Sequence, residues 1–418
     1  MKFLSFIVLA ALIAGIAVGA WVRADAPQLT EAANVIEAFG GLWLNALRMT
    51  VVPLVVSLLI VGIASVTDAA KTGGLVLRAI ILFSVLLIFA ALYGIGASNL
   101  ALQFWPIDSD AAQTFLNGAG AEAPPAQAPP TLAEWIVALA PANPVKAAAE
   151  NAILPLVVFA VFFGFAATRL EAPLRDAITT FFRAVSEAMI VIVRWVLIAG
   201  PFGVSALALG VGLRAGFGAT QTLVHYVLVV SGVTLGVTIL AWLVAIVFGR
   251  QPIGRFTAVA APVWAIAAST QSSLASLPAM LDAALRGLSI PARVADVVLP
   301  LAVAVFRFTS PVANLAVCVF VAHLYGHEPS ALQYVGAVFV AYGVSIGSVG
   351  LPGQISFIAS VAPICIALGA PTELLGILIA VEVVPDIFRT LGNVTGDLAA
   401  TAILGRGERD QSNSGNPR

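Results

Sequence analysis

The stretch Val384-Pro-Asp-Ile-Phe-Arg-Thr-Leu-Gly-Asn-Val-Thr-Gly-Asp397 lies inside an apolar segment, residues 374–404, that is long enough to cross a bilayer. Steps of three and four residues place its polar side chains, with the acid one turn before it, on one side of a helix. These polar residues are Glu382, Asp386, Arg389, Asn393 and Asp397. Charges at membrane depth are costly and persist mainly where they face a protein interior or a watery cavity. The pattern therefore favours a ligand site over a purely structural ion pair between Asp386 and Arg389.

The composition indicates a membrane protein built of helices. Of the 418 residues, 60% are hydrophobic and only 10% are charged, and the mean hydropathy is +1.03. A soluble chain of this length cannot bury that much apolar surface, and apolar runs of about 20 residues are typical of spanning helices. The net charge of −1 and the lack of a basic cluster argue against a nucleic-acid partner. We therefore predict an all-α polytopic membrane protein that has the lipid bilayer as its surroundings.

Basic residues predict the orientation of the chain in the membrane. Lys71 and Arg78 fall in one connection between apolar segments, and three arginines fall in another, residues 169–183. The connection of residues 103–131, by contrast, has three acids and no Lys or Arg. The positive-inside rule then places both termini in the cytoplasm, which requires an even number of crossings. Residues 3–20 are long for a signal peptide and are predicted to form the first spanning helix of a multi-pass inner-membrane protein.

Two stretches are predicted to lack fixed structure. Residues 103–131 are rich in Ala and Pro, which is typical of a flexible extracytoplasmic connector. Residues 405–418 are polar and are predicted to form a disordered tail.

Two other apolar blocks are interrupted too often to be plain spans. Residues 267–278, Ala-Ala-Ser-Thr-Gln-Ser-Ser-Leu-Ala-Ser-Leu-Pro, contain hydroxyl groups and a proline, and residues 345–354, Ser-Ile-Gly-Ser-Val-Gly-Leu-Pro-Gly-Gln, contain a Gly/Pro break. Gly and Pro are ordinary in membrane helices, but paired interruptions point to a transporter site built from re-entrant hairpins. Irregular backbone at membrane depth is tolerated only against protein or a cavity. Both breaks are therefore expected to face the charged stretch.

Five short segments form a specific pattern when they are taken together. They are Arg48-Met-Thr-Val-Val-Pro-Leu54, Val61-Gly-Ile-Ala-Ser65, Pro141-Ala-Asn-Pro-Val-Lys-Ala-Ala-Ala-Glu150, Gly200-Pro-Phe-Gly-Val204 and Arg389-Thr-Leu-Gly-Asn-Val-Thr-Gly-Asp397, the last with Asp386 three residues before it. In these segments the chain resembles the dicarboxylate/amino acid:cation symporters, a family that includes the glutamate transporter homologues. The resemblance covers nearly the whole chain.

The resemblance implies a fold of eight transmembrane helices and two re-entrant helical hairpins. In that fold residues 1–250 mainly form a scaffold of six helices, which assembles a homotrimer. Residues 251–404 form a transport domain that moves across the membrane. Its parts are a hairpin at 254–290, a helix at 293–324, a second hairpin at 332–370 and a last helix at 372–404.

The resemblance also implies roles for single residues. Arg389 would bind the side-chain carboxylate of an acidic substrate through a bidentate contact, and Asp386 would bind its ammonium group. The other residues implied to line the pocket are Thr390 and Asn393, the first-hairpin serines Ser272 and Ser273, and the second-hairpin tip Leu351, Pro352 and Gly353, which acts as the extracellular gate. Dicarboxylate members tend to lack the acid at the position of Asp386. Its presence favours aspartate or glutamate over succinate or malate.

The chain departs from the family where sodium would bind. The family has Asn-Met-Asp-Gly-Thr in its seventh helix, and this chain has Phe306-Arg-Phe-Thr-Ser310. Sodium needs a cage of oxygen atoms, which phenyl rings do not supply; Asp397 and Asn393 are candidate ligands only if sodium binds. In addition, Gln271 stands where many prokaryotic members have Arg, and Gln354-Ile355 replaces small residues beyond the second hairpin tip.

The coupling ion is left open between a proton and sodium. Arg307 has three interpretations: its guanidinium takes the place of a coupling cation near Asp397 or Glu382, it only satisfies a packing site or snorkels, or it is a second anion clamp in the pocket. Each interpretation predicts weakened sodium dependence. Glu382 is the best candidate for a proton carrier. Burial favours the protonated form of a carboxyl group, whereas a nearby arginine favours the carboxylate, and the sequence does not decide between them.

We therefore predict a secondary transporter that moves a small anionic substrate by alternating access. An enzyme is not expected, because the predicted spans contain no Ser/His/Asp grouping and no metal-ligand spacing, and no cofactor is expected. Two alternatives are an uncoupled anion facilitator or channel and a substrate sensor that does not transport. Net uptake into liposomes separates a transporter from a sensor, and dependence on an ion gradient separates a symporter from a facilitator.

Overall fold

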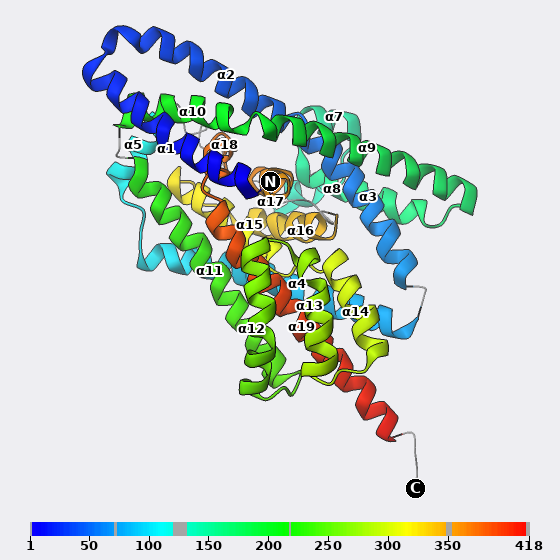
Figure 1. Ribbon diagram of the computed structural model, residues 1–418. Helices are drawn as coiled ribbons and strands as arrows, with labels where there is room; N and C mark the ends of the chain where they lie inside the picture. The colour runs from blue at the N-terminus through cyan, green and yellow to red at the C-terminus, as the bar shows by residue number, and fades with distance from the viewer. Residues whose placement is uncertain (1, 71–72, 120–131, 217–218, 348–352, 415–418) are drawn as a thin grey trace.

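The computed structural model describes residues 2–70, 73–119, 132–216, 219–347 and 353–414, and every element that it describes there is a helix (Figure 1). The all-α prediction is therefore confirmed. A bilayer core offers no water to backbone N–H and C=O groups, so a spanning chain satisfies them within its own helices.

Several of these helices have the length and composition of membrane spans. Within the described residues five candidates are long and apolar enough to cross a membrane, and a sixth is a helix pair bent by 59°. The five are Ile7–Asp25, Pro27–Thr67, Gly74–Phe104, Thr220–Val247 and Ala292–Leu324, and the bent pair is Ala172–Ile198 with Gly200–Ala215. These helices support an integral membrane protein. The number of eight spans stays a prediction, because the remaining apolar helices, Ile153–Ala167, Ala331–Ile346 and Ala359–Leu368, are shorter.

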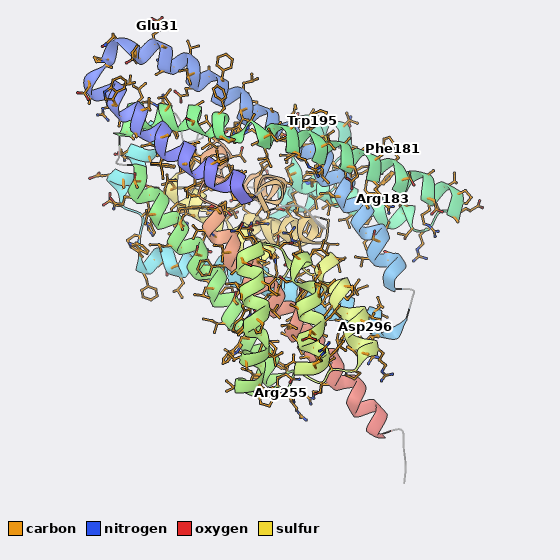
Figure 2. The ribbon with its side chains drawn as sticks, in the orientation of Figure 1. Glu31, Phe181, Arg183, Trp195, Arg255 and Asp296 are labelled. Atoms are coloured by element: carbon orange, nitrogen blue, oxygen red, sulfur yellow. The ribbon has the colours of Figure 1, made fainter. Side chains whose placement is uncertain are left out.

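The outer surface carries large apolar side chains. On α9 (Ala172–Ile198) the exposed fractions of Phe181 and Trp195 are 61% and 66%, and Figure 2 shows both on the outside of the molecule. Exposed apolar surface of this kind is unusual on a soluble monomer and suits contact with lipid. Glu31 and Arg255, by contrast, lie at opposite ends of the molecule (Figure 2).

The N-terminal helices pack along one edge of the molecule. α1 (Lys2–Asp25) and α10 (Gly200–Ala215) cross closely, because a Cβ atom on Gly19 or on Gly212 would collide with the backbone of the other helix (Figure 1). Small residues at such crossings let membrane helices approach each other. α2 (Thr30–Arg48) and α9 both contact α10, and α9 also packs on α3 (Val51–Ala70), which in turn packs on α8 (Ile153–Ala167). The short helices among residues 1–150 include η1 (Pro27–Leu29), α6 (Leu132–Ala138) and α7 (Pro144–Ala149).

The first part of the C-terminal helix α19 (Val383–Ser414) is surrounded by other helices, whereas its end projects beyond them (Figure 1). It packs against α11 (Ala219–Val247), α12 (Ile253–Thr270) and α14 (Ala292–Val305). Beside it, every residue of α15 (Ser310–Leu324) except His323 is buried. A helix that is apolar on all sides belongs in the interior of a protein. The charged stretch of α19 therefore lies in a protein core.

Two helices from residues 1–250 pack against helices from residues 251–404. α4 (Gly74–Phe104) packs on α15, and α11 packs on α19, although both lie within residues 1–250. These two helices therefore pack together with helices of residues 251–404. The division into a scaffold and a transport domain stays a prediction.

Both interrupted blocks separate two helices that pack on each other. α12 ends at Thr270 and α13 (Ser273–Asp282) begins after Gln271, which has a left-handed φ of 50°. A π-helix, η3 (Ala283–Gly287), follows α13. The second pair is α16 (Ala331–Gly347) and α17 (Gly353–Leu368), and residues 348–352 between them lie outside the described residues.

Helical structure extends into both stretches for which the sequence predicts none. α5 (Ser109–Gly118) lies within residues 103–131. The Asp108 side chain caps this helix by accepting a hydrogen bond from the Ala111 N–H at 2.8 Å, which stabilises its first turn. Residues 120–131 lie outside the described residues. α19 continues to Ser414, since no proline after Val383-Val384-Pro385 interrupts its hydrogen bonding, and residues 415–418 are again not described.

Candidate functional site

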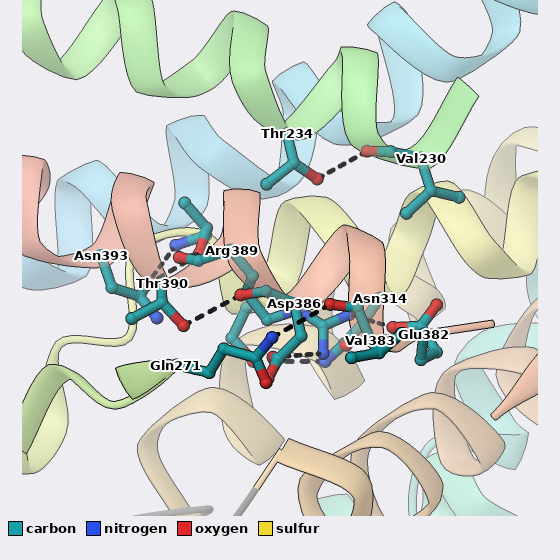
Figure 3. Close-up of polar contacts among 12 residues, drawn as sticks. Val230, Thr234, Gln271, Asn314, Glu382, Val383, Asp386, Arg389, Thr390 and Asn393 are labelled. Carbon is teal, nitrogen blue, oxygen red and sulfur yellow. Dashed lines mark hydrogen bonds and ion pairs between the residues drawn. The ribbon is translucent and has the colours of Figure 1, made fainter. Parts of the chain in front are cut away.

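The polar cluster lies at the start of α19. The short helix α18 (Leu375–Leu378) is followed by a turn that ends at Glu382, and α19 begins at the next residue. Pro385 in the first turn of α19 costs no hydrogen bond, because N–H groups there have no intrahelical partner. Asp386 and Arg389 follow on the same side, so that Figure 3 shows them together with Glu382.

Arg389 lies between two carboxyl groups. Its Nη2 atom is 3.2 Å from Oε2 of Glu382, and its Nη1 atom is 3.8 Å from Oδ1 of Asp386. The side chains of Arg389 and Glu382 are each 4% exposed, whereas that of Asp386 is 15% exposed. Nε of Arg389 has no hydrogen-bond partner among the described residues. The guanidinium is thus buried and keeps donor capacity for a further acceptor.

Glu382 has a second partner on another helix. The hydroxyl group of Tyr226, on α11, donates a hydrogen bond to Oε1 of Glu382. Both side chains are buried. One carboxylate oxygen therefore accepts from a tyrosine and the other from an arginine, which is a favourable arrangement for an ionised carboxyl group.

Arg307 acts on the same cluster from the break between α14 and α15. It is half-buried, and its charge acts on Asp386 and on Arg389. The three interpretations of this arginine stay predictions.

Asn393 is bound to the start of α15. Its Oδ1 atom accepts hydrogen bonds from the N–H and from the hydroxyl group of Thr309, both at 2.9 Å. The Thr309 hydroxyl also lies 2.7 Å from the carbonyl oxygen of Arg389. The hydroxyl group of Thr390 donates to the carbonyl oxygen of Asp386 at 2.9 Å. Asn393 and Thr390 thus brace the helix in this structure.

Asp397 lies apart from the other charges. It is 1% exposed, and its Oδ1 atom has no hydrogen-bond partner among the described residues. Gly396, the residue directly before Asp397, packs against the side chain of Phe308. Phe306 stacks on Phe83 of α4, with ring centroids 4.4 Å apart. Phenyl rings therefore fill the space beside this part of α19.

The first interrupted block reaches the cluster through Gln271. The Nε2 atom of Gln271 donates to the carbonyl oxygen of Val383 at 3.3 Å (Figure 3). The Ser272 hydroxyl caps α13 by accepting from the Ala275 N–H at 3.2 Å, and Ser273 is the first residue of α13. Gly353 is the first residue of α17. The predicted gate residues Leu351 and Pro352 lie outside the described residues.

Sequence reasoning missed two residues that hold the cluster together. Tyr226 is 156 residues from Glu382 along the chain, and Thr309 is 84 residues from Asn393. No spacing rule connects residues so far apart. The only signal for Thr309 is that it lies in the segment that departs from the family pattern.

Known proteins match nearly the whole chain. A family model described as the sodium:dicarboxylate symporter family matches residues 4–406. The chain is 27% identical over 413 residues to the proton/glutamate-aspartate symporter of Escherichia coli (strain K12), and the aligned region covers 98% of this chain and 94% of that protein. It is also 27% identical over 375 residues to the proton/sodium-glutamate symport protein of Bacillus subtilis (strain 168), an alignment that covers 89% of this chain and 86% of that protein. The human neutral amino acid transporter B(0) is 27% identical over 444 residues, an alignment that covers 96% of this chain and 80% of that protein.

Proposed function

Because the chain belongs to the sodium:dicarboxylate symporter family, we propose that it moves an acidic amino acid, such as aspartate or glutamate, or a related dicarboxylate across the inner membrane. Membership makes the chain a membrane symporter and not an enzyme. The names of the bacterial relatives support an acidic amino acid, and that of the human relative supports amino acids more broadly.

The observation that carries the substrate class is the buried guanidinium of Arg389. The planar fork of donors of Arg389 matches a carboxylate, and its Nε atom has no acceptor in the part of the chain that the structure describes. Asp386 is the more exposed of the two acids beside it, so its carboxylate is the one that an incoming ammonium group meets first. An acidic amino acid offers both groups.

Transport is proposed to be independent of sodium. The oxygen of Asn393 already accepts two hydrogen bonds from Thr309, and phenyl rings, those of Phe306 and Phe308, stand in place of oxygen-bearing side chains. Sodium prefers several oxygen ligands, so Asp397 alone is a poor site. The proton is the proposed coupling ion, with Glu382 as its carrier.

The finer architecture is part of the proposal. We expect eight spanning helices, two re-entrant hairpins formed by α12 with α13 and by α16 with α17, and cytoplasmic termini. We also expect a homotrimer and a moving unit that contains α19. The charged start of α19 contacts the first hairpin through Gln271, which supports alternating access around this site.

The first test is thermal stabilisation of the purified protein by L-aspartate, L-glutamate and succinate, each in sodium chloride and in choline chloride. A ligand that binds the folded state stabilises it by mass action. We expect an acidic amino acid to stabilise the protein equally in both salts. Stabilisation that needs sodium would contradict the proposed coupling. Stabilisation by none of the three compounds would contradict the substrate class.

A further inference from the structure

The hydrogen bond between Tyr226 and Glu382 has no role in the function proposed so far. Tyr226 belongs to α11 and is 0% exposed, and its ring lies against Phe320 of α15 with centroids 5.3 Å apart. Its hydroxyl group reaches Oε1 of Glu382, and Arg389 binds Oε2 of the same carboxyl group at 3.2 Å. Glu382 thus occupies the guanidinium that the substrate is proposed to use.

This arrangement makes the substrate and Glu382 competitors for Arg389. If a substrate carboxylate takes the guanidinium, Glu382 loses its cation while it remains buried. A buried carboxylate without a cation is strongly unfavourable, whereas a carboxylic acid is not. Substrate binding therefore favours proton uptake by Glu382, and proton uptake favours substrate binding.

Tyr226 suits both protonation states of Glu382. A phenol can donate a hydrogen bond to a carboxylate, and after a slight rotation of its O–H bond it can accept one from a carboxylic acid. Because Tyr226 is packed against Phe320, it keeps the carboxyl group in place when Arg389 leaves.

We propose that Tyr226, Glu382 and Arg389 form the unit that couples a proton to the substrate, with Tyr226 as the positioning residue. The inference rests on the proposed function. Glu382 takes a proton from water on the side where substrate enters and releases Arg389 to the substrate carboxylate. On the other side the substrate leaves, Glu382 returns the proton to water, and Arg389 binds Glu382 again. No covalent bond to the substrate forms or breaks.

Few other groups influence this unit. The described groups that act on Glu382 are Tyr226 from α11 and Arg389 and Asp386 from α19. From α15, Cys318 acts on Tyr226. Asp386 also responds to Arg307, at the break before α15. Glu382 is therefore the one carboxyl group among these that has both a tyrosine and an arginine as direct partners.

The test is the affinity of the full-length purified protein for L-aspartate and L-glutamate between about pH 5 and pH 9, measured for the wild type and three variants. Tyr226→Phe removes the positioning hydroxyl group, and Glu382→Gln imitates the protonated acid. Tyr93→Phe is the matched control. Tyr93 belongs to α4, and its hydroxyl group donates a hydrogen bond at 3.2 Å to the carbonyl oxygen of Val233, which lies on α11 as Tyr226 does but outside the unit.

We expect wild-type affinity to fall about tenfold per pH unit once Glu382 gives up its proton. Tyr226→Phe removes a donor that stabilises the carboxylate, so the midpoint of its profile should move to higher pH by about one unit. Glu382→Gln should bind with an affinity that does not depend on pH. The Tyr93→Phe profile should match the wild type.

Each other outcome overturns a defined part of the argument. A Tyr226→Phe profile that is weaker at every pH but keeps the wild-type midpoint would mean that Tyr226 is only structural. A pH-dependent Glu382→Gln variant would remove Glu382 from the unit. Should Tyr226→Phe fail to fold, the Glu382→Gln profile still decides whether the unit exists. If the wild type binds neither amino acid at any pH, the proposed function itself is overturned, whereas pH-independent binding by the wild type overturns only the coupling unit.

Discussion

At the scale of single residues, we expect Arg389 to stabilise the ligand-free protein as well as to bind the proposed substrate. Its guanidinium group lies 3.2 Å from Glu382 and 3.8 Å from Asp386. We predict that Arg389→Ala destabilises the protein by about 3–5 kcal/mol, because it leaves a buried carboxylate without its partner. The free energy of unfolding in detergent measures this loss, and binding of acidic amino acids should disappear as well.

A second substitution separates lost charge pairing from lost packing. In Arg389→Ala with Glu382→Gln, the uncompensated carboxylate is gone, so the double variant should recover a large part of the lost stability. If the two losses simply add, the ion pair is not the cause.

At the scale of elements, the crossing of α1 and α10 depends on glycine. A side chain at Gly19 would collide with the backbone of Leu209, while one at Gly232 of α11 would meet nothing within 4 Å. We predict that Gly19→Leu destabilises the protein by about 1–3 kcal/mol or more, because it forces the two helices apart. Gly232→Leu is the control and should change the melting temperature little. Equal losses in both variants would contradict a close crossing.

The elements also mark how far the sequence alone can lead. The three- and four-residue steps from Glu382 to Asp397 place side chains on one helix, because helix geometry is local. The break at Gln271 could likewise be anticipated from its polar and proline neighbours. The partners Tyr226 and Thr309 could not, since their contacts with α19 depend on how helices pack over 156 and 84 residues of chain. The helix within residues 103–131 was missed because one side chain, Asp108, starts it.

At the scale of the whole molecule, the proposed moving unit would carry its charges through a medium of low dielectric constant. The site holds two guanidinium groups, of Arg307 and Arg389, and two carboxyl groups, of Glu382 and Asp386. With both acids ionised, the empty site has no net charge. With a proton on Glu382 and an aspartate anion bound, the sum is again zero, because the added charges are +1 and −1. Asp397 contributes the same charge to both forms and does not affect the comparison.

A site that is neutral both empty and loaded avoids the cost of taking a net charge across the membrane. We therefore predict that uptake of L-aspartate into proteoliposomes is electroneutral. Its initial rate should respond to a pH gradient, acidic outside, and stay unchanged when potassium and valinomycin impose a membrane potential of about 100 mV. Each elementary charge that crosses such a potential is worth about 2.3 kcal/mol, so a charged cycle would respond strongly. Uptake driven by the potential and indifferent to pH would instead identify an uncoupled anion facilitator, and the charge balance at Glu382 would then be wrong.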